Sequence, residues 1–201
     1  FHGRTITTLA ATGQDEFHTI FGPFTPGFKY CTPNDCAELN KLVTDDVCAI
    51  MFECIQGEGG VNDLTQEFVD EIAKTAKEKD ILMVVDEVQT GNGRTGKYFA
   101  YENFGITPDI VSTAKGLAGG LPMGAVLFGE KVADHVTAGS HGSTFGGNPI
   151  AAAGAISIVE RIDDDFLAGV KAKSEYLRNE ISKIKNVTDI SGKGLMIGIS
   201  T

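Results

Sequence analysis

Short apolar runs separated by helical patterns are the feature that most restricts the fold of this chain. The runs are VCAIMFE (47–53), ILMVVDE (81–87), DIVST (109–113) and GAVLFG (124–129). Between the first two, residues 65–79 carry apolar side chains at helical spacing, with charges on the opposite side. Strands that are apolar throughout and alternate with helices are typical of a buried, mostly parallel sheet. We therefore predict an α/β fold with a mostly parallel central sheet flanked by helices.

A different pattern occupies the C-terminal part of the chain. Residues 148–162 form an apolar helix pattern with a proline near its first turn. Residues 163–185 form an amphipathic pattern that opens with acids and closes with lysines, and GLMIGIS (194–200) is a last strand. We divide the chain into a large domain, residues 1–147, and a second part, residues 148–201. The second part is expected to contain an interdomain helix and the beginning of a small C-terminal α/β domain.

Composition and charge narrow the class of protein. An apolar content of 42% and a charged content of 22% are ordinary for a globular protein. The net charge of −10 opposes binding to nucleic acids or anionic membrane surfaces. The spacing of Cys31, Cys36, Cys48 and Cys54 fits no common zinc pattern, so we expect buried, reduced thiols and no metal site. We also find no membrane-length apolar run and no signal-peptide pattern, and we expect a cytoplasmic protein.

Acidic residues and a glycine-rich loop follow the second apolar run. Asp86 and Glu87 end the run, and Gly91-x-Gly93-x-x-Gly96 comes after them. The glycine spacing matches a dinucleotide-binding motif, but that motif needs its first glycine directly after the strand. Here the five residues from Asp86 to Thr90 lie between the apolar residues of the strand and Gly91, and two carboxylates at the strand end would repel a pyrophosphate. We therefore expect these glycines to serve a turn with positive φ values.

Lys115 supplies a second chemical signal. It lies in VSTAKGLAGGLPMGA (111–125), just after an apolar run and among small residues that allow close approach. A loop lysine that simply faces water is the structural alternative. However, a strand-end carboxylate such as Asp86 and a glycine-flanked lysine are the two groups that pyridoxal 5'-phosphate needs. The lysine amine forms a Schiff base with its aldehyde, and the carboxylate keeps its ring nitrogen protonated.

Five stretches together resemble the class-III, ornithine-type family of pyridoxal-phosphate-dependent aminotransferases. The resemblance covers essentially the whole chain. It implies the pyridoxal-phosphate transferase type I fold, with residues 1–147 as part of the large cofactor-binding domain. One departure is Cys54, which stands where relatives usually have proline. The stretches are FHGRT (1–5), FECIQGEGG (52–60), VVDEVQTGNGRTG (84–96), STAKGLAGGLPMGA (112–125) and SHGSTFGGNP (140–149).

The resemblance implies specific contacts with pyridoxal 5'-phosphate. Lys115 corresponds to the Schiff-base lysine and Asp86 to the partner of the pyridine nitrogen. Gln89 matches the residue that binds the phenolic oxygen, and Phe1 an aromatic stacked on the ring. Thr144 is similar to a threonine that reaches the cofactor phosphate of the other subunit in a homodimer. The full expected set of cofactor contacts is Phe1, Asp86, Glu87, Val88, Gln89, Lys115 and Thr144.

The resemblance also implies substrate contacts. Arg4 matches an arginine that binds a substrate carboxylate, for which a planar guanidinium is well suited. Glu58 matches a glutamate that helps to switch between two substrates, and Ser143 a serine that contacts substrate. Glu53 has two open interpretations, a direct role or a buried supporting carboxylate. His2 is interpreted as part of the pocket wall.

The expected function is transfer of the terminal amino group of N2-acetyl-L-ornithine to 2-oxoglutarate, in arginine biosynthesis. Alternatives are the same chemistry on ornithine, succinylornithine, an N-acylated diaminopimelate or 4-aminobutyrate, a catalytically silent fragment, or a dinucleotide-binding oxidoreductase. The chain has no initiator methionine and ends within a strand pattern, so we expect a fragment. By resemblance, the phosphate-binding loop would precede it and a second carboxylate-binding arginine would follow it.

Overall fold

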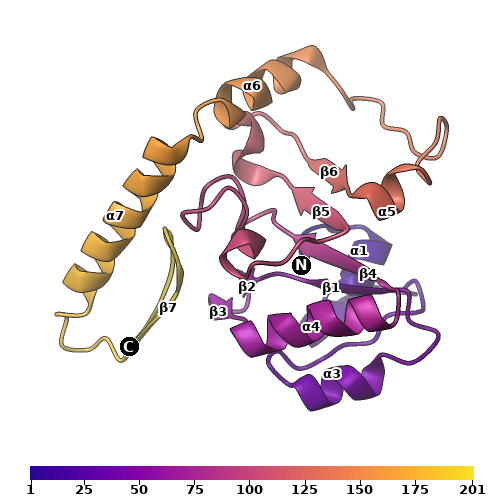
Figure 1. The fold of residues 1–201 in the computed structure, drawn as a ribbon, viewed down its shortest axis with the longest axis horizontal. Helices are drawn as coiled ribbons and strands as arrows, with labels where there is room; N and C mark the ends of the chain where they lie inside the picture. The colour runs from indigo at the N-terminus through magenta and orange to yellow at the C-terminus, as the bar shows by residue number, and fades with distance from the viewer.

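The computed structural model describes all 201 residues. Its central sheet has four strands in the order β1-β4-β5-β6, with the bounds Ala49–Phe52, Leu82–Asp86, Ile110–Thr113 and Ala125–Phe128. The first three strands run parallel and β6 is antiparallel to β5. The predicted α/β fold with a mostly parallel sheet is therefore confirmed (Figure 1).

The main hydrophobic core lies between this sheet and two helices. The amphipathic segment predicted at 65–79 is α4 (Gln66–Glu78), which packs on β1, β4 and α3 (Cys36–Leu42). It begins where the Thr65 hydroxyl accepts a hydrogen bond from the Phe68 amide, which satisfies one free N–H of the first turn. Val69 and Ile72 are almost fully buried against Val85 of β4. This packing holds β4, and the acids at its end, in place.

The remaining elements are short, apart from two C-terminal helices. None of the helices is long and apolar enough to cross a membrane. All four cysteines were expected to be buried, but only Cys54 is buried. Cys48, the residue before β1, is exposed. The further bounds are α1 Ile6–Ala11, α2 Asp15–Ile20, β2 Ile55–Gln56, β3 Asn62–Asp63, η1 Ala100–Asn103, η2 Lys115–Ala118, α5 Glu130–Ala133, α6 Pro149–Val159, α7 Asp164–Ile181, β7 Asp189–Lys193 and β8 Met196–Ser200.

The C-terminal helices and strands form a separate layer beside the sheet (Figure 1). Helix α6 contacts η2 through Ala155, which packs on Leu117 and Ala118. The guanidinium of Arg178 on α7 donates to the three successive carbonyls of residues 190–192 on β7. Helix α7 and the β7–β8 hairpin are thus held together as one unit.

The glycine-rich loop is the surface on which this C-terminal unit docks. Gly93 and Gly96 have φ values of +80° and +83°. A Cβ on Gly93 would lie 2.8 Å from the Phe166 ring, and one on Gly96 would lie 2.9 Å from Lys171. The Leu195 amide, next to β8, also donates to the Arg94 carbonyl at 2.9 Å. The glycines therefore serve positive φ values, as expected, and they also admit α7 to close contact.

Substitution of Gly93 tests this docking. Gly93→Ala should lower the free energy of unfolding by roughly 2 kcal/mol, because a side chain at positive φ is strained. The new methyl would also push against Phe166. Gly13→Ala is the matched control, because its Cβ would lie no closer than 3.7 Å to Tyr30. Urea unfolding of both variants provides the measurement, and equal stabilities would contradict the docking role.

Candidate active site

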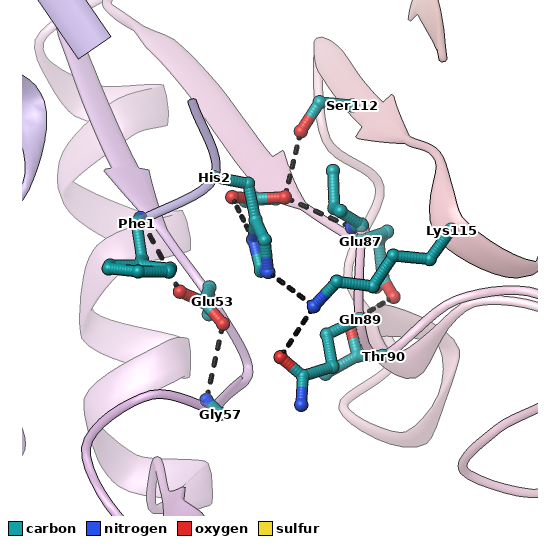
Figure 2. Close-up of polar contacts among 11 residues, drawn as sticks. Phe1, His2, Glu53, Gly57, Glu87, Gln89, Thr90, Ser112 and Lys115 are labelled. Atoms are coloured by element: carbon teal, nitrogen blue, oxygen red, sulfur yellow. Dashed lines mark hydrogen bonds and ion pairs between the residues drawn. The ribbon is translucent and has the colours of Figure 1, made fainter. Parts of the chain in front are cut away.

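The polar residues at the ends of three sheet strands meet at one edge. Asp86 is the last residue of β4, Glu53 follows β1, and Lys115 comes two residues after β5. Because these strands are parallel, their carboxyl ends lie side by side, which is where such sheets bind ligands. Figure 2 shows Glu53, His2 and Lys115 converging at this edge, with Gln89 approaching from the loop after β4.

Asp86 is the most buried member of the group, with 2% of its surface exposed. Its Oδ1 accepts hydrogen bonds from the Val88 amide and the Ser112 hydroxyl, both at 3.0 Å. Its Oδ2 lies 2.8 Å from Nδ1 of His2. Burial alone would raise the pKa of Asp86, but the bonds from His2, Val88 and Ser112 outweigh it and hold the pKa below the ordinary value. The carboxylate is therefore ionised at neutral pH.

Lys115 is connected to Asp86 through an imidazole. Its Nζ lies 2.8 Å from Nε2 of His2, and it donates to Oε1 of Gln89 at 2.8 Å. Lys115 itself has a φ of +45°, a conformation uncommon for a residue with a side chain. The result is a continuous hydrogen-bonded chain, Asp86–His2–Lys115–Gln89.

Gln89 has this orientation because Gly57 leaves room for it. A Cβ on Gly57 would clash with the carboxamide of Gln89. The Gly57 amide also donates to Oε2 of Glu53 at 3.3 Å. The turn after β2 therefore contacts both the buried acid and the amide that binds Lys115.

Glu53 is buried close to a second negative charge. Burial raises the pKa of its carboxyl, against the opposing effect of the chain's amino group, whose nitrogen lies 3.5 Å from Oε1. The neighbouring charge of Asp86 raises the pKa further. Glu53 makes no hydrogen bond to Lys115 or Gln89, and its observed contacts are those of a supporting carboxylate at the edge of the site.

Glu87 was expected to contact the cofactor, but its side chain points elsewhere. It is fully buried, and its carboxylate accepts hydrogen bonds from the Thr90 hydroxyl and from the amides of Ala100 and Tyr101. Burial raises the pKa of this carboxyl, although the three bonds oppose that effect. Alternating side chains of a strand point to opposite sides, so Asp86 and its neighbour cannot face the same pocket. The Glu87 carboxylate ties the glycine loop to η1.

The other expected residues fall into two groups. Phe1 lies against the site, with its ring 5.7 Å from that of His2, and the Arg4 guanidinium lies 5.2 Å from the centre of the Phe1 ring. Glu58 is exposed in the turn after β2, and Ser143 and Thr144 are exposed in the loop before α6. None of these last three residues makes a side-chain hydrogen bond to the group around Lys115. The structure thus brings together only part of the expected site.

Two side chains of the site were missed or underestimated from the sequence. His2 was interpreted as pocket wall, whereas its two nitrogens contact Asp86 and Lys115. Ser112 is absent from the predicted site, although it is paired with Asp86 in the register of β4 and β5. Aligning the ends of the two predicted strands could have found Ser112. For His2 the only signal was its position next to Phe1 in the first motif.

The donor set fits pyridoxal 5'-phosphate. It combines a buried, ionised carboxylate with a lysine amine and an amide, which suit a ring nitrogen, an aldehyde and a phenolic oxygen. A pocket of about 420 Å³ lies beside Lys115, between the glycine loop and β8. Asn92 lines this pocket, and its Oδ1 is buried without a hydrogen-bond partner.

A metal ion is a weaker interpretation of the same edge. Donor atoms of His2, Glu53 and Asp86 lie within 4.8 Å of one another. However, the imidazole nitrogen nearest to these acids is already bonded to Asp86, and Lys115 supplies positive charge at the other nitrogen. We therefore assign no metal to these residues.

Glu53 gives a pH-dependent prediction for this site. Its raised pKa stabilises the fold below the ordinary carboxyl pKa, and that contribution is lost as the pH rises through the raised value. Glu53→Gln removes this loss, so the variant should gain stability relative to the wild type as the pH rises above about 4. Denaturant unfolding at several pH values measures it, with the exposed Glu58→Gln as control. Identical pH dependence of Glu53→Gln and wild type would contradict the prediction.

Comparison with known proteins places this geometry in a family. The family model "Aminotransferase class-III" matches residues 1–201. The chain is 50% identical over 200 residues to an acetylornithine aminotransferase of Haemophilus ducreyi, covering 99% of this chain and 51% of that protein. It is 46% identical over 204 residues to the enzyme of the same name from Bacillus subtilis, covering 99% and 53%. The chain thus spans about half the length of the curated relatives that it matches.

Solved structures agree with this result. An ornithine aminotransferase from Toxoplasma gondii, described with partial occupancy of pyridoxal phosphate, superposes with a TM-score of 0.91 at 32% identity. That alignment covers 100% of this chain and 49% of the solved one. An N-acetylornithine aminotransferase from Stenotrophomonas maltophilia gives a TM-score of 0.74 at 37% identity, covering 85% and 46%. The chain belongs to the class-III aminotransferase family.

Proposed function

We propose that this chain is part of an enzyme that transfers the terminal amino group of N2-acetyl-L-ornithine to 2-oxoglutarate through pyridoxal 5'-phosphate. The observation that carries the proposal is the hydrogen-bonded connection of Lys115 to the ionised Asp86, in a chain with acetylornithine aminotransferases among its relatives. Ornithine as the amino donor is the second candidate, because an ornithine aminotransferase gives the TM-score of 0.91.

The roles of the residues follow from their chemistry. Pyridoxal 5'-phosphate, when bound, supplies an aldehyde and an electron-withdrawing ring. Lys115 would hold the cofactor and, once the substrate amine displaces it, move a proton between substrate and cofactor carbons. Asp86, kept ionised by its hydrogen bonds, would hold a proton on the ring nitrogen. Gln89 would bind the phenolic oxygen, and Val88 and Phe1 would pack against the ring.

Substrate binding would involve the side chains around Phe1. The guanidinium of Arg4 lies over the rings of Phe1 and Phe17, at 5.2 Å and 4.6 Å from their centres. Stacking of this kind fixes its plane and leaves its N–H groups free for a substrate carboxylate. Glu58 and Ser143 are proposed as further substrate contacts, although their side chains are exposed in this chain.

We further propose that the enzyme is a homodimer. The loop before α6, the start of α6 and strand β6 expose large apolar side chains: Phe145 is 84% exposed and Ile150 is 71% exposed. Adjacent exposed apolar residues of this kind mark interaction surfaces. Thr144 immediately precedes Phe145 in this loop, so the same contact would carry it toward a partner's cofactor phosphate.

A cytoplasmic location is proposed as well. All four cysteines are free, and thiols persist in reducing compartments.

The cofactor proposal is tested by replacing Lys115. Pyridoxal 5'-phosphate should give the wild-type chain a visible absorption band, because the lysine amine attaches to the aldehyde. Lys115→Ala should lose the band, whereas Lys97→Ala should keep it. A band of wild-type strength in Lys115→Ala would exclude the proposed role. In the complete protein, kcat/KM for N2-acetylornithine should exceed that for ornithine; the reverse order would favour the second candidate.

Replacing Ile150 tests the homodimer. A charge introduced at the start of α6 would have to be desolvated in the proposed interface, which is costly. Ile150→Glu in the complete protein should therefore sediment as a monomer at concentrations where the wild type is a dimer. Tyr176→Glu is the control, because Tyr176 is similarly exposed, at 66%, but lies on α7. An unchanged dimer in Ile150→Glu would place the interface elsewhere.

A further inference from the structure

His2 connects Lys115 to Asp86, but its imidazole has no chemical role in the proposed function. Nε2 of His2 lies 2.8 Å from Nζ of Lys115. On the other side of the ring, Nδ1 lies 2.8 Å from Oδ2 of Asp86. Asp86 is ionised and can only accept, so Nδ1 carries the proton and Nε2 of the neutral ring presents a lone pair to Lys115. Figure 2 shows the imidazole of His2 directed at the amine of Lys115.

We propose that His2 is a further catalytic residue, whose Nε2 removes a proton from the Lys115 ammonium so that the amine can react with an aldehyde. This inference rests on the proposed cofactor chemistry of Lys115. One N–H bond of Lys115 breaks, its proton forms an N–H bond on Nε2, and the electron pair stays on Nζ. An ammonium has no such pair and cannot act as a nucleophile.

The surroundings of the imidazole favour this transfer. Before it, the positive charge lies on Lys115, one ring away from Asp86. After it, the charge lies on the imidazole, whose Nδ1 is 2.8 Å from Oδ2 of Asp86, so the transfer brings the positive charge closer to the negative one. The other charged groups near His2 are the carboxylate of Glu53 and the amino group of Phe1, which lie 3.5 Å apart.

Gln89 completes the arrangement. Its Oε1 accepts a hydrogen bond from Nζ and holds the amine in place both before and after the proton leaves. Imidazole is the side chain suited to this exchange, because it ordinarily changes charge between about pH 5 and pH 8. Lys115 would need the same proton acceptor each time a substrate amine sets it free.

The test measures how fast Lys115 is captured by pyridoxal 5'-phosphate. The chain is mixed with the cofactor at a series of pH values, reduced with borohydride after set times, and analysed by peptide mass spectrometry for label on Lys115. His2→Gln is the informative variant, because Gln can donate to Asp86 and accept from Lys115 but cannot take a proton. The exposed His135→Gln is the control.

The expected result is a capture rate that falls roughly 100-fold in His2→Gln near neutral pH, within the usual range for general-base catalysis. The rates should converge at high pH, where the lysine loses its proton to solvent. In His2→Ala, free imidazole should restore the rate in proportion to its concentration, which a purely structural role would not produce.

Three results would overturn the inference. Capture with the same rate and pH profile in wild type and His2→Gln would leave the cofactor proposal standing but remove the role of His2. Faster capture in His2→Gln would mean that the imidazole blocks the site. Absence of label on Lys115 at every pH, in a chain that circular dichroism shows to be folded, would refute the cofactor proposal and this inference together.

Discussion

The parallel pairing of β4 with β5 is the constraint on which the site depends. The pairing places Asp86 opposite Ser112, whose hydroxyl donates to the carboxylate at 3.0 Å. Lys115 follows Ser112 by three residues, just beyond the carboxyl end of β5. A shift of one residue in register would turn Ser112 away and exchange Asp86 for Glu87 at the pocket. The core between β4 and α4 fixes the register, so packing far from the edge determines the chemistry at it.

Two neighbouring carboxylates show how position decides function in this fold. Asp86 and Glu87 are both buried, yet folding lowers the pKa of the first and raises that of the second. The first faces an imidazole that can share its charge. The second faces a hydroxyl and two amides, and it holds the glycine loop closed from within. A buried carboxylate therefore belongs to the proposed active site on one side of the strand, and on the other side a second one stabilises a loop.

Local sequence patterns predicted the large elements of this chain and the edge at which its polar residues meet. β4 and β5 were predictable because burial on two faces leaves a continuous apolar run, and α4 was predictable because its apolar residues recur at helical spacing. The internal orientation of Glu87 and the contacts of His2 were not predictable in the same way. These contacts depend on residues that are distant in sequence, because His2 is 84 residues from Asp86. Ser143 and Thr144 were predicted only by resemblance, and the proposed contact of Thr144 involves a second subunit.

The docking of the C-terminal unit on the glycine loop has a consequence for how sequence change is tolerated. Gln89 and Gly93 are separated by three residues, and one binds Lys115 while the other receives Phe166. A substitution in this loop is therefore pleiotropic. It changes both the position of the Lys115 amine and the packing of α7 on the loop. Variants selected for one property would need compensating changes on α7 or the β7–β8 hairpin to retain the other.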